Sequence, residues 1–310
     1  MREPHHANSA RGRRGGDEPE ANSASGSDPN SGTQEQPFAT IQKAIDKVLE
    51  FNNDTREYTI YVSGTVTPGA TTPSKGMADF SALNKNLTLT IKALSTTATL
   101  DAGARFSVDG SGTVSETNAG IGKSVIYANP SSVITLDLTL ENLVITGGNA
   151  NYGGGVYANG VTLTMKGCEI GGNRAKTSGG GVYVGGTIKM QGGKISDNAG
   201  GGLLLASGTF TMEDNAEINS NKKNDYGAGV FIVVGTLTLK SGSISYNNAY
   251  SNDGGVFVYG TFTMNNGMIS GNEATYGGGG VCVYTIGGGV FNSNGGTVSG
   301  NTPDQTIITQ

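Results

Sequence analysis

The 310-residue sequence lacks several residue types that catalysis, cross-linking and membrane insertion require. It has no tryptophan, and its two histidines, His5 and His6, both precede residue 7, so acid/base catalysis by histidine is excluded from the rest of the chain. The two cysteines, Cys168 and Cys282, match no metal-binding or redox spacing. No apolar run approaches the roughly 20 residues of a membrane-spanning helix. We therefore expect no transmembrane segment and no disulfide bond in this chain.

An excess of charge of one sign is also missing. The formal net charge is -5, and residues 161–288 hold eight Lys and Arg against eight Asp and Glu. The basic run at residues 11–14 is half cancelled by Asp17, Glu18 and Glu20. Proteins that bind nucleic acid usually carry a basic stripe, and none is visible here. We therefore expect no nucleic-acid partner.

The composition changes along the chain and divides it into four regions. Residues 1–36 hold almost nothing apolar, which is typical of a disordered tail. Residues 37–52 carry apolar residues at helical spacing behind Thr40, a suitable N-cap for a short helix. Residues 53–133 contain strand-like segments, which we expect to form irregular first coils, and residues 134–310 are periodic and form regular repeats. No apolar signal segment follows Met1, so we expect either an intracellular protein or a piece of a longer exported one.

What the sequence has in abundance is glycine, at 52 residues, and a repeat that glycine punctuates. The stretch TFTMNNGMISGN (261–272) returns as TLTMKGCEIGGN (162–173), TIKMQGGKISDN (187–198) and TLTLKSGSISYN (236–247), and more loosely at 290–301. Residues 209–221 hold one extra residue, which we expect a β-bulge to absorb. A Gly-led apolar strand such as GGGVYVGG separates the copies. The periods of 25, 23, 26, 25 and 29 residues indicate stacked units.

Stacked β-coils place equivalent residues about 4.8 Å apart in parallel ladders. The alignment predicts four inward apolar columns, which are Leu163, Ile188, Phe210, Leu237, Phe262 and Phe291; Met165, Met190, Met212, Leu239 and Met264; Ile170, Ile195, Ile218, Ile244, Ile269 and Val298; and Val156, Val182, Leu203, Val230, Val256 and Val281. A polar column holds Asn173, Asn198, Asn221, Asn247, Asn272 and Asn301. We expect these amides to bond from coil to coil and these residues to adopt the left-handed backbone of tight turns.

The pairing of GGGVYV with GTFTMNNGMISGN resembles the right-handed parallel β-helix repeats of the pectate-lyase-like superfamily. Such repeats occur in bacterial surface and adhesin-type proteins, autotransporter passengers and chlamydial polymorphic membrane proteins. The segment PFATIQKAIDKV (37–48) resembles the helix that covers the first coil of such domains. We therefore predict an all-β fold: a single-stranded right-handed parallel β-helix, with coils of about 22–29 residues and a short N-terminal capping helix.

An enzyme of this superfamily would need carboxylates that act together, and the resemblance implies a calcium-binding Asp cluster for a lyase. Glycoside hydrolysis requires paired carboxylates roughly 5 to 10 Å apart. In the repeats, Glu213 and Asp214 are the only adjacent acidic pair, and they lie in the copy with the extra residue. We predict no catalytic residues, no metal site and no cofactor. A polysaccharide lyase or hydrolase remains an alternative, with its site in residues 53–133.

Outward positions of the Gly-led strands hold a row of aromatic residues that could stack on sugar rings or contact a partner. The predicted binding residues are Tyr157, Tyr183, Phe231, Phe257, Tyr259 and Tyr284, and the same row includes Leu204 and Cys282. A ladder of good strand formers that only stabilises the sheet is the alternative interpretation.

A second outward face carries Thr-x-Thr rows, at Thr162/Thr164, Thr209/Thr211, Thr236/Thr238 and Thr261/Thr263, with Lys189 interrupting the row that begins at Thr187. Such rows resemble the ice-binding surfaces of some antifreeze proteins, so an ice-binding protein is a further alternative.

The favoured hypothesis is a non-enzymatic bacterial cell-surface or secreted module, adhesin-like or a stalk, that binds glycans or host and surface proteins through the aromatic ladder. The surface or extracellular location follows from the resemblance alone. An exposed last coil also predicts end-to-end self-association.

Overall fold

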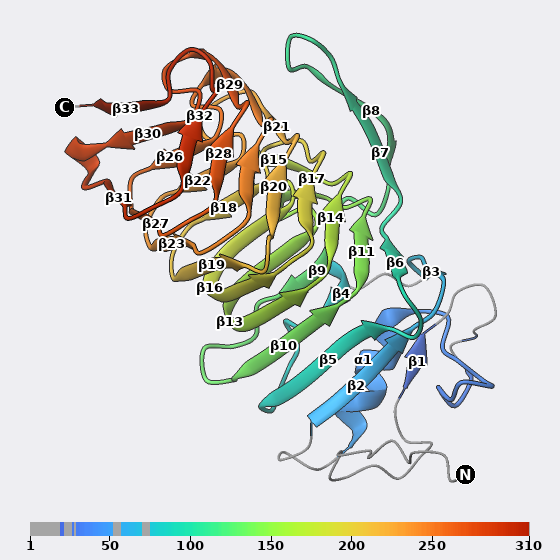
Figure 1. Ribbon diagram of the computed structural model, residues 1–310. Helices are drawn as coiled ribbons and strands as arrows, with labels where there is room; N and C mark the ends of the chain where they lie inside the picture. Colours follow the sequence, from blue (N-terminus) through green and yellow to red (C-terminus); the bar gives the residue numbers. More distant parts are fainter. Residues whose placement is uncertain (1–18, 22–26, 28, 52–56, 70–74, 310) are drawn as a thin grey trace, which may run out of the picture.

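The computed structural model describes residues 19–21, 27, 29–51, 57–69 and 75–309 (Figure 1). These residues form a parallel β-helix of about seven turns with one α-helix near its N-terminal end. The predicted all-β solenoid is therefore confirmed. Most of the predicted tail lies outside the described residues, but Glu20–Ala21 form strand β1, which pairs in parallel with β2 (Glu57–Val62).

Three sheets make the walls of the solenoid. In the described chain, the large sheet holds β1, β2 (Glu57–Val62), β4 (Gly76–Asp79), β5 (Leu87–Ala93), β9 (Ser124–Ala128), β10 (Leu136–Glu141), β13 (Val156–Lys166), β16 (Val182–Gln191), β18 (Leu203–Leu205), β19 (Thr209–Glu213), β22 (Val230–Ile232), β23 (Thr236–Leu239), β26 (Val256–Val258), β27 (Thr261–Met264), β30 (Val281–Tyr284), β31 (Val290–Ser293) and β33 (Thr306–Thr309). The second sheet holds β3 (Thr65–Val66), β6 (Ala98–Asp101), β11 (Leu143–Thr146), β14 (Glu169–Gly171), β17 (Lys194–Ser196), β20 (Glu217–Asn219), β24 (Ser243–Ser245), β28 (Met268–Ser270) and β32 (Thr297–Ser299). The third face holds β12 (Asn149–Tyr152), β15 (Arg174–Ser178), β21 (Lys222–Lys223), β25 (Asn248–Asn252) and β29 (Glu273–Tyr276).

Helix α1 (Ile41–Glu50) begins where the sequence predicts it. The Thr40 hydroxyl accepts the backbone N–H of Lys43 at 3.3 Å, which satisfies one of the free donors of the first turn. Its apolar face is fully buried through Ile41, Ile45 and Val48, and it contacts β1, β2 and β4. The helix therefore covers the apolar interior at the N-terminal end of the solenoid (Figure 1).

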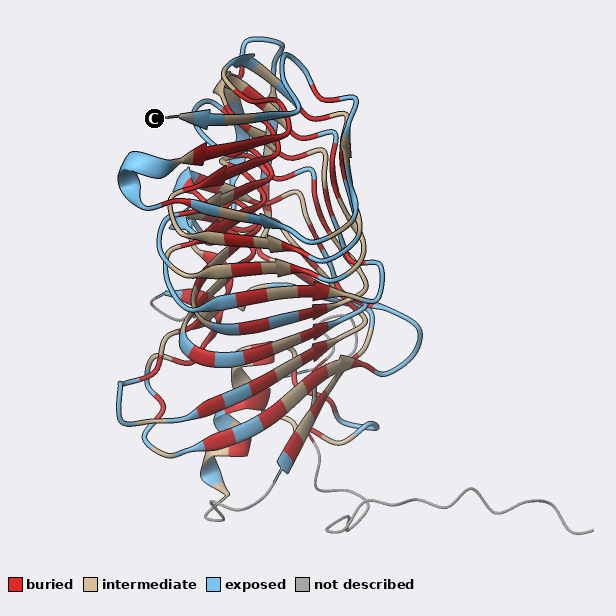
Figure 2. Cartoon of the chain, turned by 60° about the vertical axis from the view of Figure 1, so that its left-hand side comes forward, coloured by how far each residue is buried: buried red, intermediate tan, exposed pale blue. Residues whose placement is uncertain are grey.

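The four predicted apolar columns are confirmed as the core. Each member from Val156 to Val281 is at most 1% exposed, because strand alternation turns every second side chain inward. Figure 2 shows this alternation as buried segments between paler ones along the front strands. Phe291 and Val298 of the last coil are only partly buried. Ile308 and Ile286 are exposed there, and end-to-end association through this coil stays a prediction.

The asparagine ladder is confirmed, but its backbone conformation was predicted wrongly. Each side-chain amide nitrogen from Asn173 to Asn272 donates to Oδ1 of the asparagine in the next coil, at 2.9–3.1 Å. The same Oδ1 also accepts the backbone N–H of the donating asparagine. The left-handed residue is the one before each asparagine: Gly172, Asp197, Ser220, Tyr246, Gly271 and Gly300. The asparagine itself turns its side chain inward, because the preceding residue makes the turn.

The glycine clusters lie where neighbouring coils leave no space for a side chain. A Cβ built on Gly155, Gly181, Gly202, Gly229 or Gly255 would lie 2.3–2.8 Å from a carbonyl oxygen of the next coil. Contacts that short do not occur between real atoms, so these positions need glycine for space.

One local feature differs from expectation. The extra residue at 209–221 makes no bulge, since β19 pairs with β23 without a register shift; Asp214 and Asn215, both at positive φ, form a longer turn after the strand. The region 53–133 contributes strands to the same ladders as the regular coils, for example β5 against β10.

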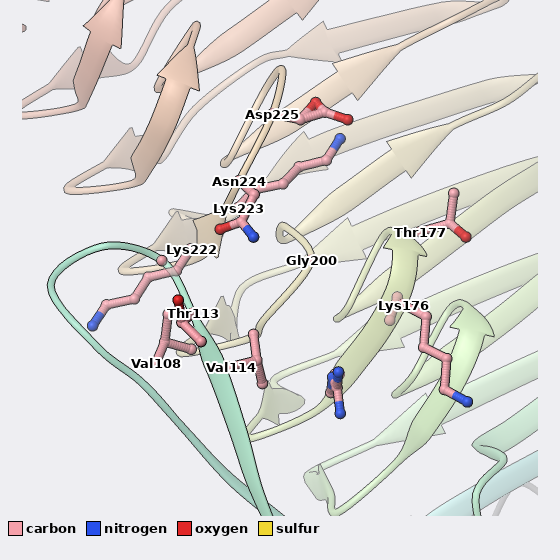
Figure 3. Close-up of a pocket in the computed structure, with 13 residues that line it drawn as sticks. Val108, Thr113, Val114, Lys176, Thr177, Gly200, Lys222, Lys223, Asn224 and Asp225 are labelled. Carbon is pink, nitrogen blue, oxygen red and sulfur yellow. The ribbon is translucent and has the colours of Figure 1, made fainter.

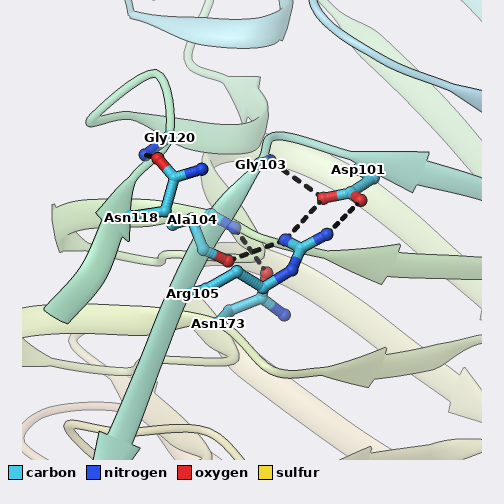
Figure 4. A network of polar contacts seen from close by, with 8 residues as sticks. Asp101, Gly103, Ala104, Arg105, Asn118, Gly120 and Asn173 are labelled. Atoms are coloured by element: carbon cyan, nitrogen blue, oxygen red, sulfur yellow. Dashed lines mark hydrogen bonds and ion pairs between the residues drawn. The ribbon is translucent and has the colours of Figure 1, made fainter.

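That region also holds an antiparallel hairpin, β7 (Ala104–Val108) and β8 (Val114–Ala119), which reaches along the third face (Figure 1). At its base, the Arg105 guanidinium binds Asp101 through two hydrogen bonds of 2.6 and 3.0 Å, and the Gly103 N–H donates to the same carboxylate (Figure 4). Further along, the Tyr250 hydroxyl donates to the carbonyl of Asp109 at 3.0 Å. The hairpin is therefore fastened to coils far apart in the sequence.

Candidate functional site

The Gly-led strands of the large sheet place aromatic rings on the outer surface in two clusters. The lower cluster contains Tyr127, Tyr152, Tyr157 and Tyr183. The upper cluster contains Tyr226, Phe231, Phe257, Tyr259 and Tyr284. Leu204, which occupies the coil between them, interrupts the row. The predicted binding residues are therefore divided between two separate surfaces.

The lower cluster is a regular stack. The ring of Tyr157 lies parallel to those of Tyr127 and Tyr183, with centroids 4.8 and 4.4 Å away and interplanar angles of 12° and 4°. Tyr152 meets Tyr183 edge-on at 5.8 Å. Burial, and then the neighbouring Tyr183 and Tyr127, raise the pKa of Tyr157 above its ordinary value. The phenol consequently stays neutral at physiological pH.

Parallel register produces the stack. Val156, Tyr157 and Ala158 pair with Ile126, Tyr127 and Ala128 below them and with Val182, Tyr183 and Val184 above them. The strand ladder alone brings the rings to stacking distance, because equivalent residues repeat at the strand spacing.

The sequence interpretation missed Tyr127, since it began the regular coils at residue 134. The signal was present, because residues 126–129 read Ile-Tyr-Ala-Asn and residues 156–159 read Val-Tyr-Ala-Asn. The amides of Asn129 and Asn159 even continue the match with a hydrogen bond of 2.9 Å. Tyr152 carried no such signal, because it ends β12, in a segment that the alignment did not cover.

A hollow of about 430 Å³ opens beside the stack, and we call it the tyrosine hollow. Its walls include Tyr127, Tyr152, Tyr157, Lys75, Lys123, Lys176 and Asn149. The Lys75 ammonium lies 5.5 Å from the centre of the Tyr127 ring, which fits a cation–π contact. This volume is in the usual range for small-molecule sites, so the stack has space beside it for a sugar-sized group.

The upper cluster is more closed than the sequence suggests. Phe257 was predicted to be an exposed contact residue, but it is 4% exposed. The ring of Tyr226 stacks on it at 4.9 Å and Tyr259 meets it edge-on at 5.0 Å. Leu204 and Cys282, also predicted to face outward, are 5% and 4% exposed. Turns of the third face fold over this rank, which strand alternation alone does not reveal.

Phe231, Tyr259 and Tyr284 remain partly exposed. Exposed Val233, Val234 and Ile286 belong to the same coils. The upper cluster therefore has an apolar character, unlike the lysine-lined lower one.

A buried lysine lies behind the upper cluster. Lys223 is 5% exposed, and its ammonium donates to the Ser178 hydroxyl at 3.0 Å and to the Tyr226 carbonyl at 2.7 Å. The same nitrogen lies 4.8 Å from the centre of the Phe231 ring. Burial lowers the pKa of Lys223 to about 8, while Asp225 acts in the opposite direction. The fold therefore holds this cation mainly with neutral partners.

Lys223 should make stability depend on pH in a definite direction. Its folded-state pKa of about 8 is below the ordinary 10.5, so the unfolded chain binds the proton more tightly. Below pH 8 the buried, protonated Lys223 lowers the stability of the folded state by its full amount, and this loss disappears as the pH rises toward 10.5. Wild type should therefore gain about 3 kcal/mol of unfolding free energy relative to Lys223→Met across that window, measured by urea denaturation.

Thiols and phenols titrate equally in wild type and in Lys223→Met, so their contributions to the pH dependence of unfolding cancel in the difference between the two proteins. Lys222→Met, at the adjacent and less buried position, is the matched control and should run parallel to wild type. A constant difference between wild type and Lys223→Met from pH 7 to 10.5 would show that Lys223 is not a buried cation.

A second hollow, the hairpin groove, lies between the β7–β8 hairpin and the third face (Figure 3). It has a volume of about 320 Å³ and is lined by Val108, Thr113 and Val114 of the hairpin and by Arg174, Lys176, Lys222, Lys223 and Asp225. Arg174 forms a 2.6 Å ion pair with Glu116 of β8, which holds the hairpin against the solenoid. Lys176 lines both this groove and the tyrosine hollow.

The surroundings of two acidic residues of the repeats shift their pKa values in opposite directions. Glu213 lies between Lys189 and Lys240, and its hydrogen bond from Gln191, with those two lysines, holds its pKa below the ordinary range. Such a carboxylate is a poor general acid at neutral pH. Burial raises the pKa of Asp253, whose Oδ1 accepts the Gly278 N–H at 3.0 Å.

Two kinds of feature are absent from the part of the chain that the structure describes. No group of three or more His, Cys, Asp or Glu side chains there could hold a metal ion. None of the helical segments described is both long and apolar enough to cross a bilayer.

The comparisons with known proteins agree with this architecture. A family model described as the right-handed beta helix region matches residues 106–266, which is 161 of the 310 residues. A comparison with curated proteins and one with solved structures gave no match. With more than half of its length matched and its coils stacked in parallel, the chain belongs to the right-handed β-helix family.

Proposed function

We propose that this chain is a non-enzymatic β-helix module of a bacterial cell-surface or secreted protein, and that it binds glycans at the lower tyrosine stack. The observation that carries the proposal is the arrangement of Tyr127, Tyr157 and Tyr183 as parallel, half-buried rings beside the tyrosine hollow. Aromatic faces suit the apolar faces of sugar rings, and neutral phenols can also donate hydrogen bonds.

The rigidity of the platform supports binding. The rings project from central strands, each bonded to a strand on both sides. A surface that is ordered before the ligand arrives loses little conformational entropy on binding. A row of rings repeating from coil to coil also matches an extended polymer better than a compact metabolite.

Truncating the middle ring tests the platform. Tyr157→Ala should weaken binding of the best ligand on a glycan array by about tenfold, which corresponds to about 1.4 kcal/mol of lost contact. Tyr246→Ala removes a ring that is 69% exposed on a turn after the second sheet, and it is the matched control. Equal affinities of the two variants for that ligand would refute the stack as the binding surface.

A polysaccharide lyase or hydrolase is the alternative, and the same preparation tests it. Incubation with the polysaccharides that bind should leave their chain length unchanged. Cleavage that carboxylate substitutions within residues 53–133 abolish would replace the binding-module proposal by the enzyme. Labelling of intact cells with a membrane-impermeant reagent tests the surface location.

An ice-binding function remains a second candidate because of one observation. The register aligns Thr162, Thr187, Thr209, Thr236 and Thr261 in a single rank of the large sheet. In the neighbouring rank, Lys189 interrupts the threonines and approaches Glu213 to 3.5 Å. Inhibition of ice recrystallisation at micromolar protein would favour this candidate, and no inhibition would remove it.

A further inference from the structure

We propose that the tyrosine hollow binds a sugar that carries a sulfate or phosphate ester. This inference rests on the proposed glycan-binding function and adds the chemical class of the ligand. Three features of the hollow point to it: its charge, an unsatisfied acceptor in its wall, and the kind of cation it presents.

The first feature is a local excess of positive charge on an acidic chain. The walls of the tyrosine hollow include Lys75, Lys123 and Lys176 and no acidic residue, whereas the whole chain has a net charge of -5. The hairpin groove shares Lys176 and adds Arg174, Lys222 and Lys223 against a single acid, Asp225. The two hollows together are therefore lined by six basic residues and one acidic residue, of which Lys223 is buried and Arg174 is paired with Glu116.

The second feature is an orphaned oxygen. Asn149 is 4% exposed, and its Oδ1 has no hydrogen-bond partner among the described residues. The Asn149 amide nitrogen donates to Glu116 at 2.8 Å, which fixes the orientation of the amide and leaves Oδ1 as the acceptor. Buried polar atoms are normally satisfied, and Asn149 is one of the residues that line the hollow. A ligand hydroxyl would supply the missing donor, which a sugar has and a bare oxyanion lacks.

The third feature separates ester oxyanions from carboxylates. The tyrosine hollow presents ammonium groups, while Arg174, the guanidinium of the adjoining groove, is held in its 2.6 Å ion pair with Glu116. A guanidinium matches the planar carboxylate through two parallel hydrogen bonds, whereas a lysine acts as a point charge suited to the many oxygens of a sulfate or phosphate. Among the described carboxylates, none lies within 4 Å of the Lys176 ammonium.

The test uses the full chain and four polymers of matched length: dextran, dextran sulfate, phosphorylated dextran and polygalacturonate. Isothermal titration at low salt should show at least tenfold tighter binding of one or both esters than of dextran and polygalacturonate. Lys176→Gln should weaken ester binding about fivefold, and Lys240→Gln, at an exposed lysine just after β23, should not. The sulfate and phosphate arms identify the ester.

Each result that differs from these expectations refutes a defined part of the proposal. Equal affinity for dextran and its esters, with Tyr157→Ala still weakening both, refutes the ester and leaves the glycan platform standing. Polygalacturonate binding as tightly as the esters refutes the preference for ester oxyanions. Equal losses in Lys176→Gln and Lys240→Gln would indicate diffuse charge attraction and refute the site. Ester binding that depends on Lys176 but ignores Tyr157→Ala keeps the anion site and refutes the tyrosine platform.

Discussion

Replacing Asn221 by alanine is expected to lower the free energy of unfolding by about 4 kcal/mol. The Asn221 amide nitrogen donates to the carbonyls of Ile195 and Asn219 and to Oδ1 of Asn247, at 2.9–3.0 Å. Its Oδ1 accepts the backbone and side-chain N–H groups of Asn198. The substitution leaves several buried groups without partners in a place that water does not reach, and each costs about 1–3 kcal/mol.

The urea midpoint of unfolding measures this effect, with Asn266→Ala as the control. Asn266 is an exposed turn residue of the next coil but one, so its loss should change stability by about 0.5 kcal/mol or less. The ladder would not be a stabilising element if both variants unfolded at the same urea concentration.

Gly181→Ala is the second large effect, with an expected loss of about 3 kcal/mol. A Cβ at this position would lie 2.6 Å from the Gly202 carbonyl oxygen and 2.5 Å from Cγ2 of Ile195. The carbonyl belongs to the backbone of the next coil, which cannot move away without breaking its own ladder. Thermal unfolding followed by circular dichroism would report the loss as a lower Tm.

Gly110→Ala provides a matched comparison, because a Cβ there meets nothing within 4 Å and φ is not positive. It should be neutral or slightly stabilising, since alanine restricts the unfolded chain. If Gly181→Ala were as stable as Gly110→Ala, the spacing between coils would be looser than the geometry requires.

Asn221→Ala and Gly181→Ala both disturb the coil-to-coil contacts that set the position of the tyrosine stack. Ladders of asparagine and close-packed glycine fix the distance between coils. That distance places the ring centroid of Tyr157 4.8 Å from that of Tyr127 and 4.4 Å from that of Tyr183. Loss of either ladder should therefore also weaken glycan binding, without any change in the rings themselves.

Much of the scaffold could be predicted from the repeat. Apolar residues equivalent to Leu163, Met165 and Ile170 recur in the five coils from Leu163 to Ile269, and a one-residue slip would turn them outward. Because burial enforces the register so strongly, the sequence alignment of the repeats also predicted which residues pair between neighbouring strands. The same argument failed for Phe257, whose outward direction on its strand was right and whose exposure was wrong.

The candidate site was less predictable, because it depends on segments that do not repeat. Lys75 lies on the approach to β4, Lys123 just before β9 and Lys176 on β15, and no periodicity links them. Tyr127 could have been found from its Ile-Tyr-Ala-Asn match. The hairpin carried no signal in the repeat pattern, because it is an insertion in one coil only.

By itself the sequence determined the coil, its inward columns and the asparagine ladder, since strand alternation and periodic burial are local rules that repetition multiplies. Only the tertiary structure decided which outward rings stay accessible, which lysines meet them and which turn residue takes the left-handed backbone. Those outcomes depend on how irregular turns fold over neighbouring coils, and such contacts join residues far apart in sequence. The repeat does not determine these outcomes, because it specifies only the contacts between equivalent residues of successive coils.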